Sequence, residues 1–181
     1  MSMNLFDNLG LQDVACVDDP FGRPVLWYIR HVDHPAYQQH IKDAGEASLI
    51  VKLRAAAQKA MTIAGAQARG DEERAQRKYE VLVAEYIGEI PEDEWVFSDT
   101  DIAGIALLID RWEGDGYEFS YEAAVAGLSR TEPIAQQISV GDEFTMEIGS
   151  PLGHSLAMWV VHLARKHEMF RADVVEAVEK N

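Results

Sequence analysis

Two short blocks of hydrophobic residues near the N-terminus predict a β-hairpin. Residues 14–17 (Val-Ala-Cys-Val) form the first block. Residues 25–32 form the second, which is short and rich in β-branched and aromatic side chains, as strands are. The residues between them, 18–24, are mostly turn formers. Two strands alone are marginally stable in water, so we expect the hairpin to pack on helices, to gain a third strand or to pair with another subunit.

Helical spacing of apolar residues replaces this pattern after His34. Alanine-rich stretches with apolar residues three and four positions apart favour helices. The predicted helices of this half run from Pro35 to residue 44, from residue 49 to a break at 68–71, and from there to a stop at 88–91. On the last of them, Glu73 and Arg77 are spaced for an ion pair one turn apart.

The second half predicts further helices, most of them with a serine or threonine at the start. Ser98 and Asp101 resemble a capping box, and the apolar residues that follow have spacings of three, four and three, which predicts a helix through Trp112. The remaining predicted helices run from Ser120 through Leu128, from Thr131 to Gln137 or beyond, and from Ser150-Pro151 through a stripe of Leu152, Leu156, Trp159, Val160, Leu163 and Phe170. The expected fold is therefore α+β and predominantly α-helical, a helical bundle with an N-terminal β-hairpin. We expect residues 1–33 to form the hairpin region, packed on an α-helical domain of residues 34–181 in one folding unit.

Charge narrows the choice of partners. The chain has a net charge of −15, and the excess of acid lies in its second half: residues 1–90 hold 13 acidic and 10 basic residues, and residues 91–181 hold 18 and 6. The electrostatic field of such an acidic chain repels phosphate. It therefore disfavours nucleic acid and anionic membranes as partners and favours basic partners. A solvated acidic face that keeps the protein soluble is the simpler interpretation. We expect a cytoplasmic protein, since the N-terminus lacks the pattern of a signal peptide and Cys16 is the single cysteine.

Residue types that could carry chemistry are present but poorly arranged. His31 and His34 lie at a strand end without an obvious third ligand, and His162 and His167 are five residues apart, which separates them on a helix. Acidic neighbours should raise the pKa of the Cys16 thiol and so disfavour the thiolate. Residues 149–155 (Gly-Ser-Pro-Leu-Gly-His-Ser) are the string most typical of an active site, but a helix-entry loop with a serine cap explains them. We therefore predict no catalytic residues, no metal site and no cofactor.

Residues 105–124 contain the most particular motif. A predicted helix ends in Trp112-Glu-Gly114, a glycine-containing turn follows, and Tyr117-Glu-Phe-Ser120 opens the next helix. This segment resembles the tail assembly chaperones of long-tailed phages and prophages, in which a helix ending in a Gly-Trp pair leads through an Asp-Gly turn into a Phe/Tyr-Ser/Thr-x-Glu helix start. The strand pair before His34-Pro35 also follows the family in outline.

The segment departs from the family in two respects. Arg111 stands where the family usually has glycine, and the connection from Gly114 to Ser120 is shorter than usual. A plain structural interpretation also exists, in which Trp112 staples two helices and Gly114 supplies a left-handed turn.

The resemblance implies a non-enzymatic viral protein of the host cytoplasm. It would bind the tape-measure protein and keep it soluble during tail assembly, with the tail tube protein as a further candidate partner. Self-association through the hairpin edge is another expectation. The candidate contacts for the partner are Trp27, Tyr28, Trp112, Tyr117, Phe119 and Trp159. For each of them, packing in the core is the more common role.

Three other functions stay open. A structural tail or neck component retained in the phage particle would share the acidic composition, and its presence in purified virions would identify it. An acidic mimic of DNA would need carboxylates spaced along one surface, whereas here they are scattered. An enzyme would have to centre on His154 and Ser155 or on His31 and His34, and full activity without His154 and His31 would exclude it.

The last residues suggest a frameshift. Chaperones of this family are commonly made in two lengths by a programmed backward slip. Residues 179–181 (Glu-Lys-Asn) can be encoded GAA-AAA-AAC, which contains the slippery heptamer A-AAA-AAC. A gene that uses AAG for Lys180 would contradict this hypothesis.

Overall fold

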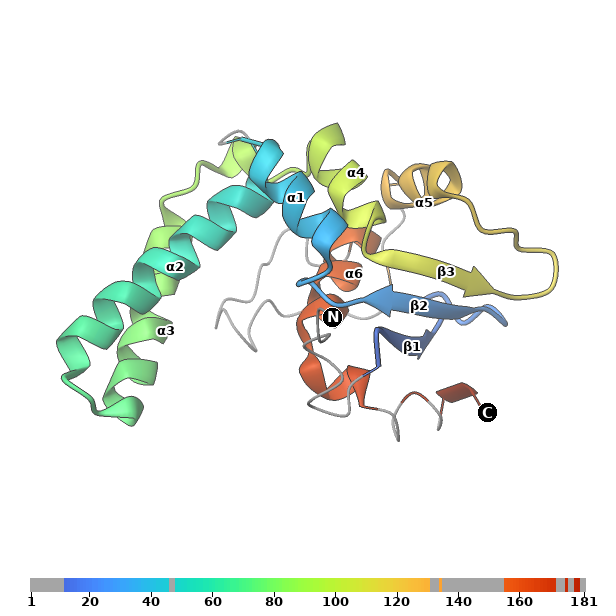
Figure 1. Ribbon diagram of the computed structural model, residues 1–181. Helices are drawn as coiled ribbons and strands as arrows, with labels where there is room; N and C mark the ends of the chain where they lie inside the picture. The colour runs from blue at the N-terminus through green and yellow to red at the C-terminus, as the bar shows by residue number, and fades with distance from the viewer. Residues whose placement is uncertain are drawn as a thin grey trace.

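A computed structural model describes residues 12–45, 48–130, 134, 155–171, 175 and 178–179. The described part holds a three-stranded antiparallel sheet and six α-helices, so the α+β, mostly helical class is confirmed (Figure 1). The strands are β1 (Val14–Asp18), β2 (Leu26–Arg30) and β3 (Ile109–Glu113). The helices are α1 (Pro35–Asp43), α2 (Leu49–Ala68), α3 (Glu72–Gly88), α4 (Asp99–Ala106), α5 (Tyr121–Leu128) and α6 (Leu156–Arg165), with 3-10 turns η2 (Glu92–Glu94) and η5 (His167–Phe170). None of the helices in these ranges is long and apolar enough to cross a membrane.

The predicted hairpin is confirmed, and it gains a third strand. The strand order is β1-β2-β3, so β2 lies in the middle and hydrogen-bonds on both sides. Val17 pairs with Trp27 across the hairpin, and Trp27 pairs with Trp112 of β3 on its other side. Gly22 takes a φ of 72° in the connecting turn, a conformation that costs glycine little.

The helix predicted through Trp112 is wrong from residue 107 onward, because the chain leaves α4 and enters β3. A β-bulge explains why the spacing of apolar residues was typical of a helix although the segment is a strand. Tyr28 pairs with Arg111 and Ile29 pairs with Ile109, so Asp110 is an extra residue on β3. The bulge places Ile109 and Trp112, three residues apart, on one face of a strand, and that spacing otherwise indicates a helix. The strand also lies inside the range 34–181 that was predicted as the helical domain.

The two faces of the sheet meet different neighbours, as the alternation of side chains along a strand requires. Trp27 and Ile29 of β2 point into the main core, which the helices share. Tyr28 points to the other face, where it packs with Cys16 and Val175 in a smaller cluster.

Helices α2 and α3 form a long antiparallel hairpin that extends away from the sheet (Figure 1). Small side chains of α2 are buried along the hairpin, at Ala56, Ala60, Ala64 and Ala68. The predicted break lies at Arg69 and Gly70, both with positive φ. The predicted helices over α1, α2 and α3 are therefore confirmed, together with an ion pair of 3.7 Å between Arg77 and Glu73.

One buried carboxylate joins α4 to α2. Asp101 forms the predicted capping box with Ser98 at the start of α4. The same carboxylate accepts hydrogen bonds from the Ser48 hydroxyl and from the N–H groups of Leu49 (3.2 Å) and Ile50 (3.4 Å) at the start of α2. Asp101 is 1% exposed, so these hydrogen bonds lie inside the core. The one carboxylate therefore satisfies free N–H groups at the starts of two helices.

Of the helices predicted after β3, the structure confirms α5 and describes part of the last one. Helix α5 follows Ser120, whose side chain accepts a hydrogen bond from the N–H of Ala123, as predicted. Helix α6 begins after Ser155, which caps it through the N–H of Met158. The helix predicted from Thr131, apart from Ile134, and the helix start predicted at Ser150-Pro151 lie outside the described residues. The last helix was predicted through Phe170, which is wrong, because α6 ends at Arg165 and Phe170 lies in the separate turn η5.

Candidate functional site

Aromatic rings from four parts of the chain meet beside the sheet. The Trp27 ring centroid lies 5.1 Å from that of Trp112 and 5.7 Å from that of Trp159 on α6. Phe119, in the loop before α5, packs edge-on against Trp112 with centroids 4.8 Å apart. Such arrangements add stability beyond burial. We call this aromatic cluster the floor of the candidate site, because the other elements of the site pack around it.

The β1–β2 turn is held over this floor by Asp19. Its side chain is buried and accepts hydrogen bonds from the Trp27 indole (3.0 Å), from the Arg23 guanidinium (2.6 and 3.0 Å), and from the backbone N–H groups of Phe21 (2.9 Å) and Arg23 (3.1 Å). Burial opposes ionisation, but the hydrogen bonds from Arg23 and Trp27 hold the pKa of Asp19 below its usual value.

The β3–α5 connection packs against this turn and leads into α5, which forms the opposite wall. Gly114 approaches the turn so closely that a Cβ there would lie 2.7 Å from the carbonyl oxygen of Pro24. Gly116 carries the positive φ, 81°, so the left-handed turn predicted at Gly114 is wrong. Close approach, and not left-handed backbone, therefore explains the glycine after Trp112.

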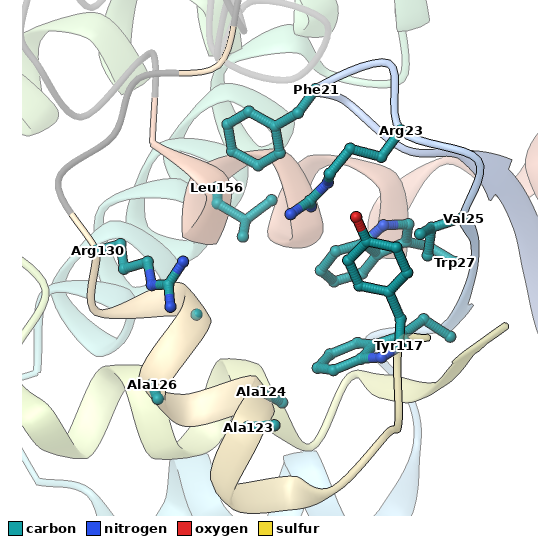
Figure 2. Close-up of a pocket in the computed structure, with 12 residues that line it drawn as sticks. Phe21, Arg23, Val25, Trp27, Tyr117, Ala123, Ala124, Ala126, Arg130 and Leu156 are labelled. Carbon is teal, nitrogen blue, oxygen red and sulfur yellow. The ribbon is translucent and has the colours of Figure 1, made fainter. Parts of the chain in front are cut away.

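A pocket of about 440 Å³ opens between these walls (Figure 2). Its lining residues are Phe21, Arg23, Val25, Trp27, Trp112, Tyr117, Ala123, Ala124, Ala126, Gly127, Arg130 and Leu156. The Arg23 guanidinium carbon lies 4.8 Å from the centroid of Phe21 and 5.7 Å from that of Tyr117, so Arg23 is packed between two aromatic side chains. Apolar walls with a few polar groups at the edge are typical of sites that bind ligands or partner side chains.

The structure gathers most of the predicted contact residues and buries several of them. Trp27 and Trp159 are buried, Trp112 and Phe119 are half-buried, and Tyr117 is exposed. The staple between two helices predicted for Trp112 is wrong, because the residue lies on a strand between Trp27 and Phe119.

Tyr28 is separated from this group. It lies on the opposite face of the sheet, under the Arg111 guanidinium at 3.7 Å. Burial raises the pKa of the Tyr28 hydroxyl. Burial is also the main cause that raises the pKa of the Cys16 thiol, with a smaller part from acidic neighbours, so the predicted direction is confirmed while its chief cause differs.

Sequence reasoning missed several residues of the pocket. Phe21, Arg23 and Arg130 were not among the candidates, although all three line it. The turn sequence Asp19-x-Phe-x-Arg carried a weak signal, since aspartate commonly binds backbone N–H groups two residues on. Nothing in the sequence around Arg130 indicated that it lines the same pocket as the turn.

The histidine candidates lie elsewhere. His31 is buried, its Nδ1 accepts a hydrogen bond from the Asp33 N–H (3.2 Å), and it lines a separate hollow of about 370 Å³ near Tyr37 and Arg165. Burial lowers the pKa of His34. Within the described ranges no three His, Cys, Asp or Glu side chains gather as metal ligands would. His154 lies outside those ranges.

Comparison of the chain with protein-family models, with curated proteins and with solved structures gives no match.

Proposed function

We propose that this protein is a tail assembly chaperone of a long-tailed phage or prophage, which acts in the host cytoplasm by binding the tape-measure protein. The aromatic pocket would take an apolar side chain from a helix of that partner, as helix-binding grooves do. The role is stoichiometric: covering exposed apolar helix faces keeps a long chain from aggregating before the tail tube encloses it.

One observation carries this proposal. The segment that resembles the chaperone family, residues 105–124, supplies four of the residues that line the pocket: Trp112, Tyr117, Ala123 and Ala124. A motif whose residues line one open apolar site is better explained by binding than by packing alone, since Tyr117 remains 42% exposed.

Blocking the pocket tests the proposal directly. Gly127 lines it, and a Cβ at this position would meet no heavy atom within 4 Å. Gly127→Trp should therefore fill the pocket without disturbing the core. Gly65 on α2 also has open space around it and lies outside the pocket, so Gly65→Trp is the matched control.

The experiment is co-expression with the tape-measure protein from the same gene cluster. We expect the wild type and Gly65→Trp to pull down the tape-measure protein and to raise its soluble fraction, and Gly127→Trp to lose both effects. If Gly127→Trp rescues as well as the wild type, the pocket is not the binding site. If the folded wild type neither binds nor rescues, or if it is found in purified virions, the structural tail component replaces the chaperone.

A further inference from the structure

The charge of the pocket runs against the charge of the whole chain. Two of its lining residues, Arg23 and Arg130, are basic and none is acidic, while the chain has 31 acidic and 16 basic residues. In Figure 2 both guanidinium groups point toward the hollow, from the β1–β2 turn and from the end of α5. The side chains that line the pocket therefore include basic groups and no acidic one, although the protein as a whole is acidic.

The two arginines differ in what they already bind. The Arg23 guanidinium forms two hydrogen bonds with the Asp19 carboxylate, which offsets its charge and fixes it as part of the wall. Arg130 is exposed, and within the described residues its guanidinium forms no ion pair. Its backbone N–H bonds to the Gly127 carbonyl oxygen (3.2 Å), which anchors the residue at the end of α5.

We propose that the pocket selects a segment of the partner protein in which a bulky apolar side chain is flanked by a carboxylate, and that Arg130 binds that carboxylate. This inference rests on the proposed function and specifies the partner's chemistry. The planar guanidinium matches a carboxylate through two parallel hydrogen bonds. The apolar side chain covers the exposed surface of Tyr117 and of Ala126 on α5.

The bound segment needs both the carboxylate and the apolar side chain to match the pocket. An isolated anion would leave the exposed apolar surface of Tyr117 and Ala126 in water, and a purely apolar side chain would desolvate the exposed Arg130 guanidinium without supplying an acceptor, which costs free energy. The long-range field of the acidic chain repels acidic partners, so the carboxylate should be a local feature of an otherwise neutral or basic segment.

The test uses the full chain and two capped dipeptides, acetyl-Phe-Glu-amide and acetyl-Phe-Gln-amide. They have nearly the same shape and differ in one charge, and their caps remove the terminal charges. Ligand-observed NMR gives both affinities. We expect the wild type to bind the glutamate peptide about tenfold more tightly, because the glutamine amide keeps one acceptor oxygen and so loses one of the two charge-assisted hydrogen bonds. Arg130→Gln should lose this preference while its affinity for the glutamine peptide is unchanged, and Gly127→Trp should bind neither peptide.

Three outcomes would overturn the inference. The first is equal affinity of the wild type for the two peptides, and the second is a preference that survives in Arg130→Gln. The third is binding of 3-phenylpropionate, tested in parallel, without binding of either peptide, which would identify a small organic acid as the ligand. Because the peptides replace the tape-measure protein, failure of co-expression with an intact peptide preference would reject the chaperone role and leave the site's selectivity standing.

Discussion

The indole N–H of Trp27 donates a hydrogen bond to the Asp19 carboxylate over 3.0 Å, and both side chains are buried. The same carboxylate holds Arg23, so one acidic group positions a side chain of the pocket floor and a side chain of its wall. Asp19 is thus a positioning residue, because it does not itself line the pocket.

Replacing this carboxylate should weaken both the fold and the pocket. Asp19→Ala leaves the Trp27 N–H and the turn N–H groups without their acceptor, and we expect a loss of about 2–3 kcal/mol in the free energy of unfolding. Urea denaturation measures it. Asp18→Ala is the control, because Asp18 is exposed and next in sequence. Trp27→Phe removes the donor, and a double-mutant cycle with Asp19→Ala should give a clear coupling energy. Additive losses would contradict the pairing.

Acid should destabilise the protein through the same group. The pKa of Asp19 is lowered in the folded state, so the unfolded chain binds more protons as the pH falls below its ordinary value of 3.8. The contribution of Asp19 is therefore complete above that pH and is lost as the pH falls through the lower, folded-state pKa. Asp110 acts with the same sign, because hydrogen bonds from Arg111 and Arg30 outweigh its burial and lower its pKa.

Asp19→Asn should flatten the dependence of unfolding free energy on pH in this acidic range. Denaturation midpoints measured from neutral pH downward would test this. An unchanged slope would mean that Asp19 titrates alike in both states.

The junction between α2 and α4 should be the most sensitive polar site. In Asp101→Asn, an amide NH₂ that cannot accept hydrogen bonds replaces one carboxylate oxygen. At Oδ1 it would lose the bonds from Ser48 and Ile50, and at Oδ2 those from Leu49 and Ser98. We expect a loss of about 3 kcal/mol or more, since bonds to charged groups contribute roughly 1.5–3 kcal/mol each. Asp99→Asn, at an exposed position in the same helical turn, should cost well under 1 kcal/mol. Equal losses would show that the shared cap contributes little.

Two glycines should respond oppositely to alanine. At Gly104 a Cβ would lie 2.5 Å from the ring of His40, which bonds the Thr100 carbonyl oxygen (2.8 Å). Gly104→Ala should lose about 1 kcal/mol or more despite its better helix propensity. Gly65→Ala, in open space, should gain up to about 1 kcal/mol. Adding His40→Ala to Gly104→Ala should recover part of the loss, and no recovery would place the clash elsewhere.

The helices could be read from the sequence because their signals are local. Ser98 and Asp101 form the capping box that their spacing predicted, and Ser120 caps α5 as expected. The long-range role of Asp101 was invisible, because its bonds to Ser48 and Leu49 join residues that only the fold brings together.

The strand β3 could not be predicted from the sequence, because its local pattern fits two kinds of structure. Helices and bulged strands both place residues three apart on one side, so Ile109 and Trp112 fit either structure. The segment forms a strand because it pairs with the free edge of β2, which is more than 70 residues away in sequence. For example, the Arg30 side chain donates a hydrogen bond to the carbonyl oxygen of Leu107 across 77 residues. The aromatic residues of the pocket were named from their type, but their meeting with Arg130 depends on the same distant pairing.

The position of β3 also has a consequence for synthesis on the ribosome. Arg30 at the end of β2 and Asp110 in the bulge are 80 residues apart, and the α2–α3 hairpin lies between them. That hairpin can form early from nearby contacts, whereas the middle strand must wait for a distant segment to emerge and close a long loop. Until then β2 presents an open edge to other nascent chains, so the slowest and most vulnerable stage of folding should be the arrival of β3.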